Sequence, residues 1–494
     1  MNKKLIIYFD VVVYTSTTKN MTITFHGAAG TVTGSKHLIK LKNGIQLLLD
    51  CGMFQGRGDE TDELNEHFGF NPEEVNYLIL SHAHIDHCGL IPRLVADGFK
   101  GTIFSTAATM DLARILLNDS AGIQKNDTDY INKKEVRTGR VPMVPLYTEE
   151  DVMEAMRLFK IVEYNEDYEI DSRIKFCFTD AGHILGSAAI NITILEDAKF
   201  TQITFSGDLG RYNDMLLKSP QSFPQADYII MESTYGDSYH KDLEPIEGQL
   251  QEIITQTCLV KKGKLIIPAF SVGRTQELLY ALNALELNGT LPDVPFYVDS
   301  PLSLKATEVL KGHTQVYNNK VQDVLKRDED IFQFTGLKFI DSVEESKRLN
   351  DDPRPCVIIS SSGMAEAGRV KHHIRNNIQN NKNTILLVGY CEPNSLGGQL
   401  MSGKKIVQIF GDDYDVRAEV KVIRSMSAHG DCADLLQFLS CQDPKEVKQI
   451  YLVHGENKVQ ENFRDKLLEV GFASIKIPAQ HQVENLELKE VIQD

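Results

Sequence analysis

Short apolar runs recur along the chain and alternate with polar segments that have a helical pattern. Residues 21–49 contain strand-like alternation on both sides of a glycine-rich turn at 27–35. That turn lacks the G-K-[ST] ending of a phosphate loop, so we expect it to bring backbone near a site instead. Residues 107–160 are polar and helical in pattern, and strand-like runs return between 175 and 205. This order predicts paired strands, then helices, then further strands.

A second alternation occupies the middle of the chain, where helical patterns such as 246–259 and 274–285 separate continuous apolar runs. The apolar runs are 264–268, 295–298, 357–360 and 384–388. Continuous apolar strands separated by helices indicate a parallel sheet that is covered on both faces. After residue 403 the pattern predicts strands at 406–410 and 420–423, a helix at 432–439 and a strand at 449–453.

Size and composition are those of an ordinary globular protein. A chain of 494 residues favours two joined domains, and contents of 42% hydrophobic and 24% charged residues give no sign of extensive disorder. The formal net charge of -17 argues against a protein that coats nucleic acid by charge alone. It leaves open a phosphodiester substrate held by metals and a few local cations.

The cysteines and the first residues bear on the compartment. Eight cysteines without a C-x-x-C pair favour neither a zinc ribbon nor a disulfide framework, and reduced thiols indicate a cytoplasmic protein. The apolar stretch in residues 1–20 is interrupted by Asp10, has no cleavage site and is too short for a membrane helix. We expect an edge strand or a start-site extension there, with Met21 as an alternative start, and no membrane attachment.

Three histidines and an aspartate lie within six residues directly after the apolar run 77–80. Alternate positions of an extended chain share a face, so His82, His84 and Asp86 are expected to point the same way. His87 is expected on the first turn of the helical pattern that follows. Imidazole and carboxylate together are typical ligands of zinc and similar metals. The alternative, a polar loop whose histidines satisfy backbone groups, does not explain why so many imidazoles are crowded together.

Further polar residues follow other apolar strands. They are Asp50, His183, Asp208, Glu232 and His454. Loops at strand ends of α/β proteins commonly hold reactive groups, because a rigid sheet edge positions them. Each such residue alone is more often part of a turn. Together they supply the ligands that a two-metal site would need beyond residues 82–87.

With these residues the chain resembles the metallo-β-lactamase fold, through H-x-H-x-D-H at 82–87 and through Asp50, His183 and Asp208. It resembles in particular the β-CASP nucleases, which include ribonuclease J, archaeal relatives and the pre-mRNA 3′-end cleavage subunit. The segments that carry this resemblance are 231–236, 268–279, 361–364, 427–431 and 453–456. The resemblance covers residues 21 to about 477.

The resemblance implies an α/β fold: a metallo-β-lactamase αββα sandwich with an inserted β-CASP cap domain built on a mainly parallel sheet. Residues 1–236 would form the N-terminal part of the lactamase domain, with 1–20 as an extension. Residues 237–427 would form the cap, and 428–494 the C-terminal part of the lactamase domain.

The resemblance also implies roles for single residues. His82, His84 and His183 would bind one zinc, Asp86, His87 and His454 would bind the second, and Asp208 would bridge both. Asp50 would orient ligands or the bridging solvent, and His429 and Glu232 would be a proton-handling pair outside the metal spheres. Mn²⁺ or Fe²⁺ are alternatives to zinc at nitrogen and oxygen ligands of this kind.

The expected reaction is hydrolysis of RNA by water activated between two metals, leaving 5′-phosphate and 3′-hydroxyl ends. His429 would give the leaving oxygen its proton. His454 favours RNA, because within the family a histidine in this last motif accompanies RNA substrates.

On the cap, Arg274, Ser361 and Ser362 are expected to bind substrate phosphates. The basic run at 369–375 is either a further contact or a solvated helix face. Cys391 stands where relatives often have glutamine, which leaves the cap-side contacts open.

Three other classes remain as alternatives. A hydrolase of a small ester, thioester or lactam could use the same metals but would not need the inserted unit or the His429–Glu232 pair. A flavo-diiron oxygen reductase usually has glutamate where this chain has His84. A non-catalytic RNA-binding scaffold would be expected to have lost ligands that are all present here. The sequence leaves open endo- or exonuclease action, RNA preference and oligomeric state, with a homodimer among the alternatives.

Overall fold

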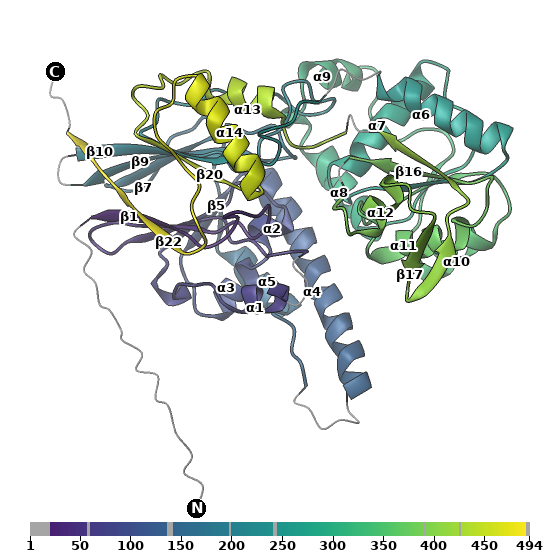
Figure 1. The fold of residues 1–494 in the computed structure, drawn as a ribbon, viewed down its shortest axis with the longest axis horizontal. Helices are drawn as coiled ribbons and strands as arrows, with labels where there is room; N and C mark the ends of the chain where they lie inside the picture. Colours follow the sequence, from purple (N-terminus) through teal and green to yellow (C-terminus); the bar gives the residue numbers. More distant parts are fainter. Residues whose placement is uncertain are drawn as a thin grey trace, which may run out of the picture.

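The computed structural model describes residues 20–56, 60–135, 142–196, 199–240, 245–389, 391–423 and 426–490. Two units lie side by side: one built on two stacked sheets that contains the first and last described strands, and one built on a third sheet (Figure 1). The expectation of an edge strand within residues 1–20 falls almost entirely outside the described residues. Among the helices of the described ranges, none combines the length and the apolar character that crossing a membrane requires.

The first sheet has seven strands in the order β22-β1-β2-β3-β4-β5-β6. The pairs from β22 to β3 are antiparallel, and those from β3 to β6 are parallel. Its strands are β1 (Met21–Phe25), β2 (His37–Lys40), β3 (Gln46–Leu49), β4 (Tyr77–Ile79), β5 (Thr102–Ser105), β6 (Phe159–Ile161) and β22 (Gln482–Leu486).

The second sheet has the order β21-β20-β11-β10-β9-β8-β7, with β23 also paired to β10. Its strands are β7 (Tyr168–Asp171), β8 (Ile174–Asp180), β9 (Ala188–Glu196), β10 (Lys199–Phe205), β11 (Tyr228–Glu232), β20 (Gln449–Val453), β21 (Ile475–Lys476) and β23 (Lys489–Glu490). Strand β11 pairs in parallel with β20, which comes more than two hundred residues later, so the chain leaves this sheet and returns to it.

The intervening segment forms the third sheet, in the order β14-β13-β15-β12-β16-β19, and every pair in it is parallel. Its strands are β12 (Leu265–Pro268), β13 (Phe296–Val298), β14 (Leu337–Phe339), β15 (Val357–Ser360), β16 (Thr384–Val388) and β19 (Glu419–Ile423). A separate antiparallel pair, β17 (Ile406–Ile409) and β18 (Asp412–Asp415), lies outside it. The continuous apolar runs therefore form the buried parallel sheet that they predicted.

The helices cover the outer faces of these sheets (Figure 1). In the two-sheet unit they are α1 (Glu60–Glu66), α2 (Ile85–Cys88), α3 (Ile91–Ala96), α4 (Ala107–Glu135), α5 (Glu149–Arg157), α13 (Cys432–Leu439) and α14 (Asn457–Glu469). In the other unit they are α6 (Ile246–Ile254), α7 (Arg274–Leu287), α8 (Pro301–Gly312), α9 (Asn319–Leu325), α10 (Val343–Asp351), α11 (Gly368–Asn377) and α12 (Leu396–Met401). The pattern at 246–259 predicted one helix, whereas α6 ends at Ile254 and continues as a π-helical turn over Thr255–Val260.

Buried side chains divide the two-sheet unit into four layers. One cluster, with Phe25, Leu49, Phe178 and Ile192, fills the space between the two sheets. A second packs α13 and α14 on the outer face of the second sheet. A third, on the outer face of the first sheet, includes residues of α3, α4 and α5. This helix–sheet–sheet–helix arrangement agrees with the expected αββα sandwich.

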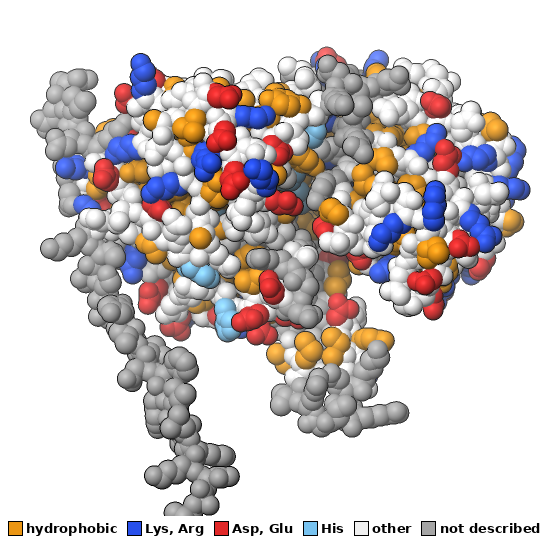
Figure 2. Space-filling model, viewed as in Figure 1, with side chains coloured by type: hydrophobic (Ala, Val, Ile, Leu, Met, Phe, Trp, Pro, Cys, Tyr) orange, Lys and Arg blue, Asp and Glu red, His pale blue; other side chains and the backbone are white. Residues whose placement is uncertain are grey.

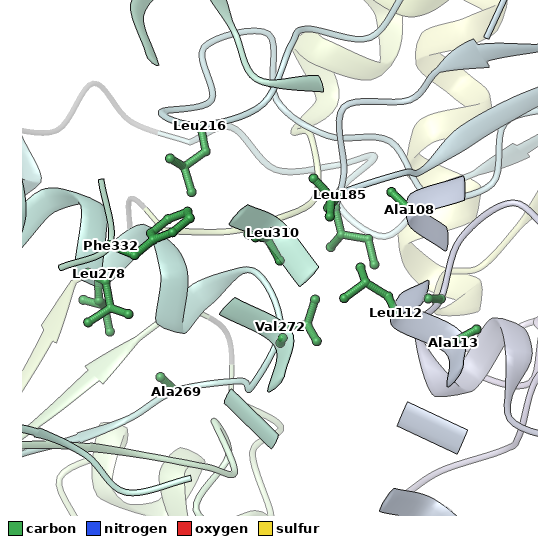
Figure 3. Close-up of a cluster of buried hydrophobic side chains, with 14 of the residues drawn as sticks. Ala108, Leu112, Ala113, Leu185, Leu216, Ala269, Val272, Leu278, Leu310 and Phe332 are labelled. Carbon is green, nitrogen blue, oxygen red and sulfur yellow. The ribbon is translucent and has the colours of Figure 1, made fainter. Parts of the chain in front are cut away.

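The third cluster continues from the sandwich into the other unit. Leu112 of α4 and Leu185 of the sandwich lie close to Val272 and Leu310 of the second unit (Figure 3). Burying such aliphatic side chains is worth roughly 1.5–3 kcal/mol each. This apolar contact stabilises the docking of the two units, and His313 Nε2 adds a hydrogen bond to the Asp111 carboxylate of α4 at 3.0 Å.

Candidate metal centre

The residues predicted at strand ends meet at one edge of the sandwich. Asp50 follows β3 in the first sheet, while Asp208, Glu232 and His454 follow or end β10, β11 and β20 in the second. Asp50 and His454 both have left-handed backbones, with φ of 58° and 49°. Left-handed conformations of residues other than glycine cost energy and cluster at functional sites. Here the two turns redirect the side chains at the sheet edge.

The backbone conformation of residues 82–87 differs from the predicted one. Strand β4 ends at Ile79, His82 and His84 lie in an irregular loop, and Asp86 and His87 both lie in α2. The expected extended run with alternating side chains is therefore wrong, whereas His87 does lie on the first turn of a helix, which begins at Ile85. The side chains converge because the loop turns directly into a short helix.

Close backbone contacts fix this short helix. The Asp86 carbonyl oxygen accepts from the backbone of Ser35, in the glycine-rich turn, at 2.8 Å. A Cβ added to Gly52 would lie 1.6 Å from the same oxygen, so only glycine fits there. The glycine-rich turn thus lies against the site, as expected.

Four donor atoms form the first group. His84 Nδ1 lies 3.2 Å from His82 Nε2 and 3.1 Å from His183 Nε2. Asp208 Oδ2 lies 3.6 Å from His82 Nε2 and 3.7 Å from His183 Nε2. Ligands of a tetrahedral zinc with bonds of about 2.0–2.1 Å lie roughly 3.3–3.4 Å apart. The four atoms have the spacing of such a coordination sphere.

A second group lies on the other side of Asp208. Its remaining oxygen, Oδ1, is 3.3 Å from His87 Nε2 and 3.6 Å from His454 Nδ1. His454 Nε2 in turn lies 3.4 Å from Asp86 Oδ2. The ligand atoms of Asp86, His87 and His454 lie within 4.8 Å of one another. Asp208 therefore turns one oxygen to each group.

Asp50 lies behind the second group and is fully buried. Its Oδ2 lies 2.6 Å from His87 Nδ1, while its Oδ1 accepts from the Ser81 backbone at 2.8 Å and its Oδ2 from the Ser81 hydroxyl at 2.9 Å. A carboxylate can only accept here, so His87 carries a proton on Nδ1 and turns Nε2, the atom left to bind a metal, towards the centre. The geometry fits the orienting role expected for Asp50.

His429 and Glu232 form a pair beside the first group. Glu232 is fully buried, and its carboxylate lies 3.2 Å from His429 Nδ1. His429 Nε2 points towards the centre, 4.0 Å from Asp208 Oδ2. The Leu209 backbone donates to Glu232 at 2.5 Å and holds the carboxylate in place. His429 is thus oriented by Glu232 and lies farther from Asp208 than His82 and His183 do.

The electrostatics favour the ligand forms of four side chains, whereas the charges of Asp208 and Asp50 outweigh burial and raise the pKa of His87, which favours its protonated form in the absence of a cation. Burial lowers the pKa of His82 and His183, and burial lowers the pKa of His84 to about 4, so these imidazoles are neutral at pH 7. Burial disfavours the charged form of Asp208, but His454 and His87 outweigh it and lower the pKa of this carboxyl. Neutral imidazole and ionised carboxylate are the forms that bind metals.

His429 behaves differently from these ligands. Burial lowers its pKa, but the charge and hydrogen bond of Glu232 outweigh burial and raise the pKa to about 9. Without a cation nearby, this imidazole holds a proton at neutral pH.

Unsatisfied atoms complete the test of whether a metal fits. Among the described residues, the buried atoms His87 Nε2 and Asp208 Oδ1 have no hydrogen-bond partner. An unpaired buried polar group is costly, and coordination of a cation would satisfy both atoms. The donor chemistry, the spacing and these two atoms fit a metal ion held by this cluster.

The cap residues predicted to bind substrate lie in the second unit and make internal contacts. Arg274 begins α7, is only 6% exposed and contacts Glu277 through Nη1. Ser361 Oγ lies 2.9 Å from Ser300 Oγ, and Ser362 Oγ accepts from the Ala367 backbone at 3.3 Å. Both serines are half-buried.

Two supporting residues were not singled out from the sequence. Ser81 makes two hydrogen bonds to Asp50, and Thr234 Oγ1 lies 3.0 Å from His454 Nδ1. Ser81 directly precedes the histidine cluster and Thr234 follows Glu232 by two residues. Proximity to predicted ligands was the available signal, but it does not specify which neighbours turn inward.

Three family models match the chain in order. A metallo-β-lactamase superfamily domain matches residues 38–224, a β-CASP domain matches 275–400, and a Zn-dependent metallo-hydrolase RNA specificity domain matches 413–478. These matches confirm the predicted fold class and the recognised family. A crystal structure of a protein of unknown function from Enterococcus faecalis V583 shares the fold, with a TM-score of 0.51 at 12% identity over 94% of this chain and 100% of that chain.

Several relatives are similar over most of the chain. Ribonuclease TTHA0252 of Thermus thermophilus is 33% identical over 91% of this chain and 95% of its own length. An RNase J-like protein of Methanocaldococcus jannaschii is 33% identical over 92% and 96%. The cleavage and polyadenylation specificity factor 73 of Drosophila melanogaster is 30% identical over 87% of this chain and 59% of that protein. The chain therefore belongs to the β-CASP ribonuclease family of the metallo-β-lactamase superfamily.

Proposed function

We propose that the protein is a zinc-dependent ribonuclease that hydrolyses RNA phosphodiester bonds and leaves 5′-phosphate and 3′-hydroxyl ends. The observation that carries the proposal is the carboxylate of Asp208, whose two oxygens face two separate donor groups. One zinc would be held by the first group and a second by the other, with Mn²⁺ or Fe²⁺ as alternatives. The proposed ligands are His82, His84 and His183, then Asp86, His87 and His454, with Asp208 between them.

When bound, two cations would supply an activated water and offset negative charge on the phosphate. The chain's own residues orient the metal ligands and hold a proton near the centre. Asp50 holds the His87 tautomer, and Glu232 holds His429 by Nδ1, which leaves His429 Nε2 facing the centre. We assign His429 the transfer of a proton to the leaving ribose oxygen. Because water and not the 2′-hydroxyl attacks, the products carry 5′-phosphates.

RNA is the proposed substrate because relatives over nearly the whole length are named ribonucleases, and because the last motif contains His454. We propose Arg274, Ser361 and Ser362 as phosphate contacts on the cap. We place the cap boundaries near residues 237 and 427, within the segments that join β11 to α6 and β19 to α13. All eight cysteines are free, which supports a reducing compartment such as the cytoplasm.

The test is product mapping. Purified protein with zinc is incubated with RNAs that carry a 5′-triphosphate, a 5′-monophosphate or a 3′ label, and the ends of the products are identified by mass spectrometry. A parallel panel contains a thioester and nitrocefin. Hydrolysis of RNA to 5′-phosphate ends is expected. A 2′,3′-cyclic phosphate would rule out attack by water, and turnover of the thioester or lactam without RNA cleavage would overturn the proposal.

A further inference from the structure

The structure divides the basic run of α11 into two sets. Arg369 and His373 turn inward, where Arg369 Nη1 lies 2.7 Å and His373 Nε2 lies 2.6 Å from the fully buried carboxylate of Asp299. These two side chains stabilise the cap. Lys371, His372 and Arg375 are instead half-buried or exposed. The second set does not contact Asp299, whereas Arg369 is committed to it although its side chain is as exposed as that of Lys371.

The outward set surrounds one exposed aromatic ring. Phe410, in the turn between β17 and β18, is 48% exposed. The centre of its ring lies 4.6 Å from the ring centre of His372, 5.3 Å from Lys371 Nζ and 5.8 Å from the guanidinium carbon of Arg375. We call these four residues the α11–Phe410 patch. They combine a flat apolar surface with cations on its border.

The backbone at Phe410 is held in an unfavourable conformation. Its φ is 57° and that of Gly411 is 91°, as in a tight hairpin turn of type I′. Asparagine or glycine adopts such a first position readily, whereas a bulky residue is an outlier there. The neighbouring Ile409 is fully buried, whereas the side chain of Phe410 is not. Burial therefore does not offset the cost of the backbone conformation at Phe410. An exposed aromatic residue kept in a strained turn points to a use outside the core.

The cations nearest the ring are Lys371 and Arg375, and acidic residues lie close to them. Within the described ranges, neither Arg375 nor the nearby exposed Lys347 forms an ion pair. Lys371 Nζ donates to the Glu366 backbone carbonyl at 3.2 Å and lies 3.9 Å from its carboxylate, and Asp412 and Asp413 of β18 directly follow Gly411. Figure 2 shows lysine and arginine side chains, with acidic ones among them, on the face of the cap over α10, α11 and β17.

We propose that the α11–Phe410 patch binds a single-stranded stretch of the RNA substrate outside the metal centre, with a base stacked on Phe410 and phosphates contacted by Lys371 and Arg375. Aromatic platforms bordered by cations are how proteins hold single strands without reading sequence. A protein-docking core would instead be expected to be depleted of charged residues. This inference rests on the proposed ribonuclease function.

The position of the patch allows one continuous RNA strand to contact both the serine loop and the patch. Helix α11 begins shortly after Ser362, whose hydroxyl accepts from Ala367, and both serines of this loop are proposed phosphate contacts. Arg375 lies seven residues after Gly368, which is about 10 Å along a helix axis. RNA leaving the loop can follow α11 to Phe410.

The test compares a short RNA of about 6 nucleotides with a long one of about 30. Phe410→Asn removes the ring and relaxes the turn, so the fold should be retained, and Phe410→Tyr keeps an aromatic face. We expect Phe410→Asn to raise KM for the long RNA at least about fivefold. Its kcat, and KM for the short RNA, should not change. Phe410→Tyr should behave like the unaltered protein.

Charge is tested separately. Arg375→Gln should weaken binding of the long RNA and reduce its dependence on salt. Lys458→Gln removes one cation from α14, 75% exposed and in the other unit, and serves as the matched control that should change nothing. Cross-linking of a photoreactive long RNA to the peptide containing Phe410 gives a direct readout.

The outcomes separate the two proposals. If the short RNA is hydrolysed but Phe410→Asn and Arg375→Gln leave KM for the long RNA unchanged, the patch assignment is wrong and the ribonuclease assignment stands. If neither RNA is hydrolysed, the proposed function fails first. A change in oligomeric mass on Phe410→Asn, with RNA affinity unaltered, would make this surface a contact between protein chains and would overturn the proposal.

Discussion

Replacing Asp50 by asparagine tests the logic of the proposed second metal site. The carboxylate accepts the Ser81 backbone N–H on Oδ1 and faces His87 Nδ1 with Oδ2. In Asp50→Asn, the amide oxygen must stay with the Ser81 N–H, which places the NH₂ group against His87 Nδ1. His87 must then accept at Nδ1 and carry its proton on Nε2, the atom that faces Asp208 Oδ1 at 3.3 Å. A protonated nitrogen cannot bind a metal.

The expected loss of metal affinity in Asp50→Asn follows from this one change of tautomer at His87. Loss of a carboxylate that orients a histidine ligand typically costs 10–100-fold in metal affinity, or about 1.4–2.7 kcal/mol. Only the group containing His87 should lose metal affinity, because among the described residues Asp50 bonds to Ser35, Ser81 and His87 and not to His82, His84 or His183. The assay is zinc titration against a competing chelator, followed by elemental analysis. At low free zinc, Asp50→Asn should retain one equivalent where the unaltered protein retains two.

The control is Asp227→Asn, another buried carboxylate in the same unit. Asp227 accepts from the Gln202 backbone at 3.0 Å and from the Thr201 hydroxyl at 3.2 Å. Its replacement should cost comparable stability in urea without affecting zinc. Two equivalents bound by Asp50→Asn with unaltered affinity, or loss of both together, would refute the reasoning about the tautomer.

The remaining predictions concern catalysis and acid stability. Asp86→Ala and His183→Ala should each abolish RNA cleavage with the fold retained, as checked by circular dichroism, and wild-type rates in either would remove that residue from the site. His429→Ala should slow cleavage about 10²–10⁴-fold with zinc still bound, and elemental analysis showing lost metal would make His429 a ligand. Burial and then the charges of His481 and Lys36 lower the pKa of His26 to about 3. The unfolded chain takes up this proton near pH 6.5, so the stability that neutral His26 contributes falls as pH drops below that value, by about 2 kcal/mol at about pH 5. Urea unfolding of His26→Gln should show a deficit relative to the unaltered protein that shrinks by this amount from about pH 8 to about pH 5, and an equal deficit at both would contradict it.

The sequence by itself determined most strands and the order of the units. The continuous apolar runs at 264–268 and 357–360 became neighbouring strands of the parallel sheet, because strands buried on both faces have no polar side to alternate with. It also predicted the residues that meet in the candidate metal centre, since imidazoles crowded into residues 82–87 have few other uses. The sequence predicted the position of the helix at 246–259 correctly. It did not predict that the helix ends in a π-helical turn, in which Thr257 and Cys258 are buried.

What only the tertiary structure decided is the direction of individual side chains. The histidines converge through an irregular loop and α2 and not through an extended strand, because backbone contacts from Ser35 and Gly52 fix the turn. The basic run on α11 divides into side chains that bind Asp299 and side chains that do not, because Asp299 faces one side of the helix. Phe410 lies in the turn of a hairpin that is remote from α11 in the sequence, and its ring packs beside Lys371 of that helix. Contacts between distant segments have no local pattern, so hydrophobic periodicity and motif spacing cannot encode them, and the folded chain alone reveals them.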